Sequence, residues 1–243
     1  MKKIKDFFDL IKLYFSFLFQ KVTIIILSIS FVLMTILLIL IAASGYDYVY
    51  YLKNYIDIHS KYINEALLIV TLFNTIIASC MVISLFINSI SFDHLYISYT
   101  KRRTLLISKA LILFIVLAFI TSIEVIIIYL IPTIKYPYFK IDGTILLVPM
   151  FIYLPLFTEV ILLMTVSVIV PNIFVTMIMA FVAIADKLIL ANVSSIYNVF
   201  KYIIPSSYQS GIYIYSNALY MVPILGLLFF ILYIKIYEIK DLA

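Results

Sequence analysis

Apolar residues fill six long stretches of this chain, and shorter polar segments separate them. The first stretch, Val22–Ala43, contains no acidic, basic or histidine residue in its 22 positions. About 20 apolar residues in a row allow a helix to cross the hydrocarbon core of a bilayer, and a helix satisfies its own backbone hydrogen bonds there. The pattern therefore predicts an all-α polytopic membrane protein whose six spans are 22–43, 66–91, 104–131, 145–170, 173–191 and 217–234.

The segment before the first span, residues 4–20, has a different pattern. Its apolar residues recur at helical spacing and its polar residues gather on the opposite side, which predicts an amphipathic helix lying along the inner membrane surface. A plain extension of the first span is the alternative. The apolar side is Ile4, Phe7, Phe8, Ile11, Phe15 and Leu18, and the polar side is Lys5, Asp9, Lys12, Ser16 and Gln20.

Two connections between spans are also distinctive. Pro171-Asn172 is all that separates the fourth span from the fifth, and it predicts a very tight turn. Residues 192–216 are too interrupted by polar residues and by Pro205 to cross a membrane, yet too apolar for a free loop. They favour short helices that re-enter the outer leaflet and are surrounded by protein. An interfacial loop with no special role is the alternative.

Composition excludes most soluble classes of function. The 243 residues are 66% hydrophobic and 12% charged, so we expect one transmembrane domain, 1–243, with no room for an ordinary soluble domain. Cys80 is the only cysteine, and the two histidines lie in linkers on opposite sides of the predicted membrane, which excludes a disulfide and a metal site built on them. The four glycines are too far apart for a phosphate-binding loop. We therefore expect no enzyme activity and no cofactor in this chain, and energy from an ion gradient or from a partner.

Basic residues are distributed unevenly across the predicted membrane. With the N-terminus inside, eleven Lys and Arg residues lie on that side, five lie on the other side and Lys187 lies within a span. Because cytoplasmic loops carry an excess of positive charge, we predict a multi-pass protein with both termini in the cytoplasm. Orientation in a lipid membrane then explains the net charge of +5, and we expect no nucleic-acid partner.

Four ionisable residues fall inside the predicted spans: Glu124, Glu159, Asp186 and Lys187. At 1.5 Å per residue, Glu124 and Lys187 both lie roughly 20–30 Å from the inner face, so an ion pair between them is plausible, with Asp186 near the outer interface. Glu159 lies near the middle of its span with no cation at its depth. Intramembrane charges mark function by default, so these residues are candidates for a substrate or proton path, with structural pairing between helices as the alternative.

The loop 92–103 is the only sizeable inner loop between predicted spans, and Lys109 follows it. Its basic end is explained by anchoring at the inner surface. That explanation leaves out the preceding stretch of mixed polarity, whose length suits docking onto another protein. The candidate docking residues are Asp93, His94, Tyr96, Tyr99, Lys101, Arg102 and Arg103.

This layout resembles the permease subunit of an ABC-2 type transporter. The shared features are six spans, an N-terminal interfacial helix, an acidic residue and then a basic cluster between spans two and three, and a proline-containing segment before the last span. The resemblance implies that 92–103 is a coupling helix on a separate ATPase subunit, which binds ATP and Mg²⁺. It also implies that 192–216 forms outer helices that help close the pathway, and that two permeases, identical or homologous, assemble with two ATPases. The chain departs from the family pattern in having Asp93 where a glutamate is frequent, no glycine beside it and no proline before Lys101.

A compact permease of this kind is similar to bacterial exporters of amphipathic peptides, such as phenol-soluble modulins, and to bacteriocin immunity transporters. The resemblance implies an ATP-driven exporter in the bacterial plasma membrane, whose substrate is an amphipathic or hydrophobic molecule, most simply a peptide. Two alternatives stay open. One is a proton-coupled secondary carrier that uses Glu159, and the other is a non-transporting immunity or scaffold protein.

Overall fold

A computed structural model of the chain describes residues 2–43, 55–89, 93, 102–136, 139, 141, 143–146, 148–190 and 218–239. Every regular element in these ranges is helical, which confirms the predicted all-α class. The predicted re-entrant segment 192–216 lies outside them. The elements are α1 (Lys2–Leu18), α2 (Lys21–Ala43), α4 (Tyr55–Val82), a π-helix η1 (Ile83–Ile87), α6 (Arg102–Lys135), a 3₁₀ turn η2 (Gly143–Leu146), α7 (Val148–Ile169), α8 (Ile173–Leu190) and α10 (Ala218–Ile239).

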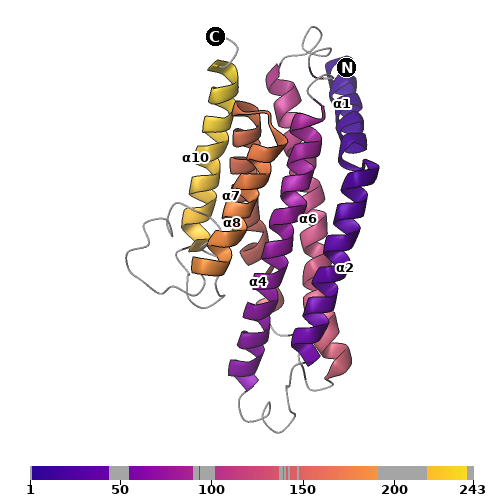
Figure 1. Cartoon of the computed structure of the whole chain (residues 1–243), viewed down its shortest axis with the longest axis vertical. Helices are drawn as coiled ribbons and strands as arrows, with labels where there is room; N and C mark the ends of the chain where they lie inside the picture. The colour runs from indigo at the N-terminus through magenta and orange to yellow at the C-terminus, as the bar shows by residue number, and fades with distance from the viewer. Residues whose placement is uncertain are drawn as a thin grey trace.

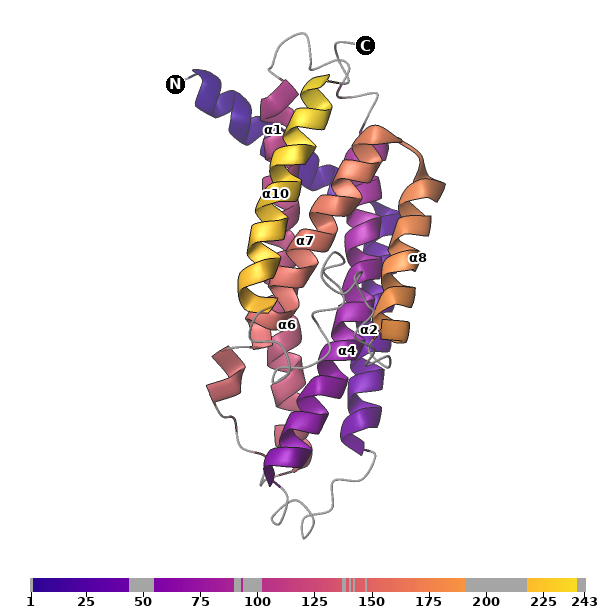
Figure 2. The same cartoon turned by 90° about the vertical axis from the view of Figure 1, so that its left-hand side faces the viewer.

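The long helices run side by side in an elongated bundle (Figure 1). Helix α4 is central and packs against α2, α6, α7 and α8, while α10 packs mainly against α7. The view in Figure 2 places α7 between α10 and α8. Helix α1, the start of α6 and the end of α10 all lie at the same end of the bundle.

Within the described ranges, three helical segments are long and apolar enough to cross a membrane: Lys21–Ala43, Glu65–Ile87 and Thr104–Lys135. They coincide with the first three predicted spans. The shorter apolar segments Leu156–Ile169 and Ile173–Ala185 fall within the fourth and fifth predicted spans, and Gly226–Ile236 overlaps the sixth and extends two residues past its predicted end. Many large apolar side chains of α2 face outward, as expected of a helix surrounded by lipid rather than water.

Helix α4 begins at Tyr55, well before the predicted start of its span at Ala66. The added turns carry charged residues, so hydropathy alone misses them, but Tyr62 and Ile63 are buried against the bundle. The far end of α4 widens into η1, where the Asn88 amide donates to the Ile83 carbonyl at 3.2 Å. Such π-turns often mark functional sites in helices.

Helix α6 continues through Pro132, a residue that normally breaks a helix. Proline lacks an amide hydrogen, so the carbonyl four residues earlier loses its helical partner. That carbonyl belongs to Ile128, and the Tyr62 hydroxyl of α4 donates to it at 2.8 Å. A side chain from the neighbouring helix thus replaces the missing backbone bond.

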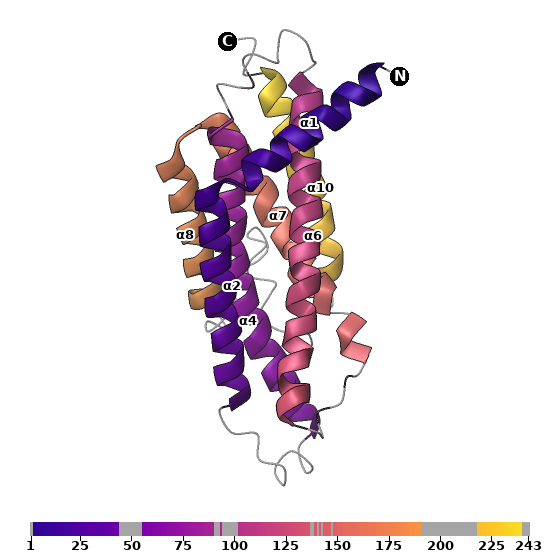
Figure 3. The same cartoon turned by 90° about the vertical axis from the view of Figure 1, so that its right-hand side faces the viewer.

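Helix α1 covers nearly all of the predicted 4–20 segment and crosses the first turns of α6 obliquely before the chain enters α2 (Figure 3). Its protein-facing side differs from the predicted apolar side. Leu10, Tyr14 and Leu18 are buried, whereas Phe8 and Phe15 are 62% and 49% exposed. The apolar arc is therefore divided into a side covered by protein and an exposed phenylalanine side. A polar contact determines which side of α1 faces the protein, because the Tyr14 hydroxyl donates a hydrogen bond to Asp93 inside the bundle.

The very tight turn predicted at Pro171-Asn172 is present between α7 and α8. The Asn172 side chain accepts a hydrogen bond from the Phe174 amide at 2.8 Å, which caps the first turn of α8. Below the turn, the hydroxyls of Ser167 and Thr176 lie 3.0 Å apart and join the two helices.

Candidate functional site

Four side chains form a buried polar group at the α1 end of the bundle, here called the Asp93 cluster: Tyr14, Ser89, Asp93 and Lys109. The Lys109 ammonium forms an ion pair with the Asp93 carboxylate and donates to the Ser89 hydroxyl at 2.7 Å. The Tyr14 hydroxyl donates to the other Asp93 oxygen at 2.7 Å. The cluster therefore connects α1, the segment after η1 and α6 through charge-assisted hydrogen bonds.

The Lys109 ammonium is buried among aromatic side chains, so the fold depends on its ion pair with Asp93. Lys109 is only 3% exposed, and its nitrogen lies 5.1 Å from the ring centroids of both Tyr14 and Phe86, within the range of cation–π attraction. Removing one partner of a buried ion pair leaves an uncompensated charge, which is strongly destabilising. Lys109 and Asp93 must therefore stay together for the bundle end to keep this arrangement.

Local backbone geometry places the two acceptors of this cluster. The Ser89 hydroxyl bonds to the Leu85 carbonyl, and the Asp93 amide donates to the Ser89 carbonyl at 2.9 Å. The bond from Asp93 to Ser89 has the four-residue spacing of an α-helix. Residues four apart lie on the same side of a helix, so Ser89 and Asp93 both reach the Lys109 ammonium.

The structure places only part of the predicted docking loop. Asp93 is buried and bonded within the chain rather than presented at the surface. Arg102 and Arg103 form the first turn of α6, but their side chains lie outside the described parts, as do all of His94, Tyr96, Tyr99 and Lys101. Sequence reasoning missed Tyr14 and Ser89, and it grouped Lys109 with the surface basic residues. The available signal was the lysine's position five residues inside an apolar helix.

A second polar group lies deeper, between two buried apolar clusters. One apolar cluster gathers around α1, η1 and the beginning of α6, and the other around the second half of α2 and the end of α6. Between the two apolar clusters, α2, α4 and α6 each carry buried polar side chains. The buried residues of this polar layer are Ser30 on α2, Thr71, Asn74 and Thr75 on α4, and Thr121 and Glu124 on α6.

Within the polar layer, the Asn74 amide nitrogen donates to Glu124 Oε2 at 2.8 Å. Both side chains are almost fully buried, at 1% and 0% exposed. Among the described side chains, no cation lies within ion-pair distance of Glu124. The predicted partner Lys187 and the neighbouring Asp186 belong to α8, but their side chains lie outside the described parts, so that pairing stays a prediction.

Glu159, the third predicted intramembrane acid, lies in the middle of α7 and is 4% exposed. The adjacent face of α7 packs tightly on α10. A Cβ added at Gly226 would lie 3.2 Å from the Phe157 ring and 3.3 Å from the Thr158 hydroxyl. Small residues permit such close approach of helices in membranes, so Glu159 lies beside a closely packed helix pair.

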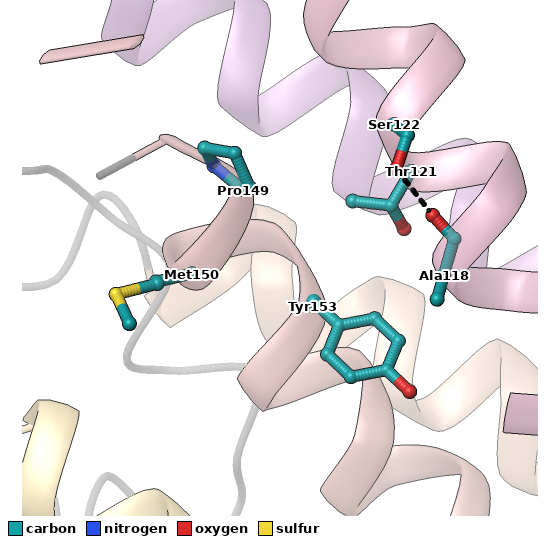
Figure 4. Close-up of a pocket in the computed structure, with 6 residues that line it drawn as sticks. All are labelled: Ala118, Thr121, Ser122, Pro149, Met150 and Tyr153. Atoms are coloured by element: carbon teal, nitrogen blue, oxygen red, sulfur yellow. Dashed lines mark hydrogen bonds between the residues drawn. The ribbon is translucent and has the colours of Figure 1, made fainter. Parts of the chain in front are cut away.

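A pocket of about 280 Å³ lies between α6 and α7. Figure 4 shows Ala118, Thr121 and Ser122 on one side of it and Pro149, Met150 and Tyr153 on the other. Its walls are mainly apolar. The Ser122 hydroxyl donates a hydrogen bond to the Ala118 carbonyl at 2.8 Å, and the Tyr153 hydroxyl donates to the Phe114 carbonyl at 3.2 Å.

Comparison of the chain with protein-family models, with curated proteins and with solved structures finds no match. Function is therefore argued from the residues and their geometry.

Proposed function

We propose that this chain is the permease subunit of an ATP-driven exporter of the ABC-2 type, which moves an amphipathic or hydrophobic substrate, most simply a peptide, out of a bacterial cell. The observation that carries the proposal is the Asp93 cluster. It joins Asp93, near the start of the 92–103 loop, to α1 and to α6 through buried bonds. A force applied to that loop would pass directly into two helices.

We infer from this geometry a more specific role for Asp93 than docking. Its carboxylate is engaged by Tyr14 and Lys109 within the chain, so it acts as the fixed end of the loop. Contact with the ATPase then falls to the residues that follow: His94, Tyr96, Tyr99, Lys101, Arg102 and Arg103. In this arrangement ATP and Mg²⁺ bind in the partner, and this chain converts the partner's motion into helix movement.

The finer parts of the proposal follow from the same assignment. Six spans cross the membrane with both termini in the cytoplasm, and α1 lies along the inner surface with its exposed phenylalanines toward lipid. Two permeases, identical or homologous, assemble with two ATPase subunits. The substrate enters from the inner leaflet near α1, and 192–216 forms outer helices that help to close the pathway.

Co-purification with an ATP-binding-cassette protein, followed by ATPase assays in proteoliposomes, tests the proposal. Asp93→Asn and Lys109→Met should each reduce substrate-stimulated ATP hydrolysis several-fold while the chain still inserts. Ser16→Ala is the matched control, because Ser16 is exposed and bonds only to its own helix at Leu13. Transport that persists after ATP depletion and requires Glu159 would replace the proposal with the proton-coupled carrier. A chain that copurifies with no ATPase and moves no substrate would favour the immunity protein.

A further inference from the structure

The Glu124 carboxyl group is in an unusual chemical position. It is 0% exposed, lies in a segment apolar enough to cross a membrane, and accepts one hydrogen bond, from the neutral amide of Asn74. Taking an ionised carboxylate out of water costs several kcal/mol even after the protein relaxes. A single neutral donor does not offset a cost of that size.

Three oxygen atoms in the polar layer have no hydrogen-bond partner in the part of the chain that the structure describes. They are Glu124 Oε1, Asn74 Oδ1 and Thr121 Oγ1. Glu124 and Asn74 are already joined through their other polar atoms, and Thr121 precedes Glu124 by three residues, which is one helical turn. A buried acceptor without a donor is destabilising, because it has lost its hydrogen bonds to water. The site therefore lacks a hydrogen-bond donor for these oxygens and a positive charge to neutralise the Glu124 carboxylate.

We propose that Glu124 is a proton-binding site inside the bundle, with the proton on Oε1 and with Asn74 and Thr121 as its polar partners. One proton removes the charge and turns an unpartnered acceptor into a donor. The acid and the Asn74 amide then each present a donor and an acceptor to the other. A monovalent metal ion would supply charge but needs more oxygen ligands than the three unpartnered atoms here.

Among the described side chains of the surrounding helices, none supplies a positive charge to compensate Glu124. Helix α2 has no ionisable residue between Val22 and Ala43. Asn74 is the residue of α4 that contacts the carboxyl group. From Glu65 to the end of α4, and along α7, the ionisable residues are Glu65, Cys80, Tyr153 and Glu159, and none of them is a cation.

The pocket between α6 and α7 supplies a route for the proton. Thr121 lines it (Figure 4), and its unpartnered hydroxyl is one turn from Glu124. A volume of about 280 Å³ has room for several waters at ~30 Å³ each. Water in the pocket can therefore reach the Thr121 side chain, and the proposed path to the Asn74–Glu124 pair passes through its buried hydroxyl.

Infrared spectroscopy of the full chain in lipid nanodiscs tests the site without any transport partner. At neutral pH, wild-type protein should show the carbonyl band of a buried protonated carboxylic acid, and Glu124→Gln should lose it. Glu65→Gln, at a half-buried acid that begins the apolar segment Glu65–Ile87 of α4, should keep the band. Loss of a carboxylate band in place of the acid band on Glu124→Gln would overturn the proposal, as would sodium-dependent thermal unfolding at fixed pH.

Two further variants keep the test decisive if Glu124→Gln does not fold. Asn74→Leu should shift the acid band to higher frequency, because the acid loses its amide partner, and an unshifted band would count against the site. Thr121→Val should slow the deuterium shift of that band severalfold after transfer to D₂O. Ser122→Ala, the adjacent residue on the pocket wall, should leave the exchange rate unchanged. Equal rates in the two variants would refute the route through Thr121.

Discussion

The Tyr62 hydroxyl of α4 donates 2.8 Å to the Ile128 carbonyl of α6, the carbonyl that Pro132 leaves without an amide partner. This bond explains how a proline is tolerated within a 34-residue helix. In a bilayer, no water replaces a missing backbone partner in the hydrocarbon region. The stability of α6 therefore depends on a side chain 66 residues away in sequence.

Tyr62→Phe removes this hydroxyl and should lower the free energy of unfolding by about 1 kcal/mol, the usual scale of interhelical hydrogen bonds in membranes. The measurement is detergent-induced unfolding in mixed micelles. Tyr153→Phe is the matched control. The Tyr153 hydroxyl donates to the Phe114 carbonyl over a longer distance, 3.2 Å. No proline lies four residues after Phe114, because Ala118 stands there and keeps its backbone amide. Equal losses in the two variants would show that Pro132 is irrelevant.

The ion pair between Lys109 and Asp93 leads to a second prediction. Asp93→Asn or Lys109→Met alone should destabilise the folded chain by roughly 3–5 kcal/mol. The first leaves the buried Lys109 ammonium without its carboxylate, and the second leaves the Asp93 carboxylate without its ammonium. The double variant should regain part of this loss, since no uncompensated charge remains. A double-mutant cycle on unfolding free energies measures the coupling. Additive losses would show that the two residues do not interact in the membrane.

The close contact between α7 and α10 gives a third prediction. Gly226→Val should destabilise the protein by about 1–3 kcal/mol, because the new side chain overlaps the Phe157 ring and the Thr158 hydroxyl. Gly143→Val is the control, since a Cβ at Gly143 meets nothing within 4 Å. Thermal unfolding of both variants in nanodiscs compares them. A harmless Gly226→Val would mean that α7 and α10 are not packed at this distance.

Hydropathy predicts the helical class and the approximate positions of the long apolar helices, because a bilayer imposes apolar runs on any chain that crosses it. It misses the early start of α4 at Tyr55, since that start depends on Tyr62 and Ile63 packing against distant residues. The turn at Asn172 was predictable because proline and asparagine act locally.

The candidate sites were less predictable, because they are made by contacts between helices. Periodicity identified α1 but not the side it turns inward, which Tyr14 determines by bonding to Asp93, 79 residues away. Glu124 stood out as an acid in an apolar run. Its partner Asn74 did not, since a neutral amide interrupts such a run only weakly. The estimated depth of Lys187 suggested it as an ion-pair partner of Glu124, and that pairing stays a prediction because the Lys187 side chain lies outside the described parts.

The exposed phenylalanine side of α1 gives the last prediction. The chain contains no tryptophan, so each introduced tryptophan is a single reporter of its position. Phe15→Trp should emit at short wavelength and be quenched by brominated lipid, because Phe15 lies on the exposed apolar side beside Phe19, with ring centroids 4.6 Å apart. Ser16→Trp, one residue further on the polar side, should respond instead to a water-soluble quencher. This contrast is expected only if α1 lies in the interface with its phenylalanines toward the acyl chains. Equal quenching of both positions from water would place α1 away from the lipid.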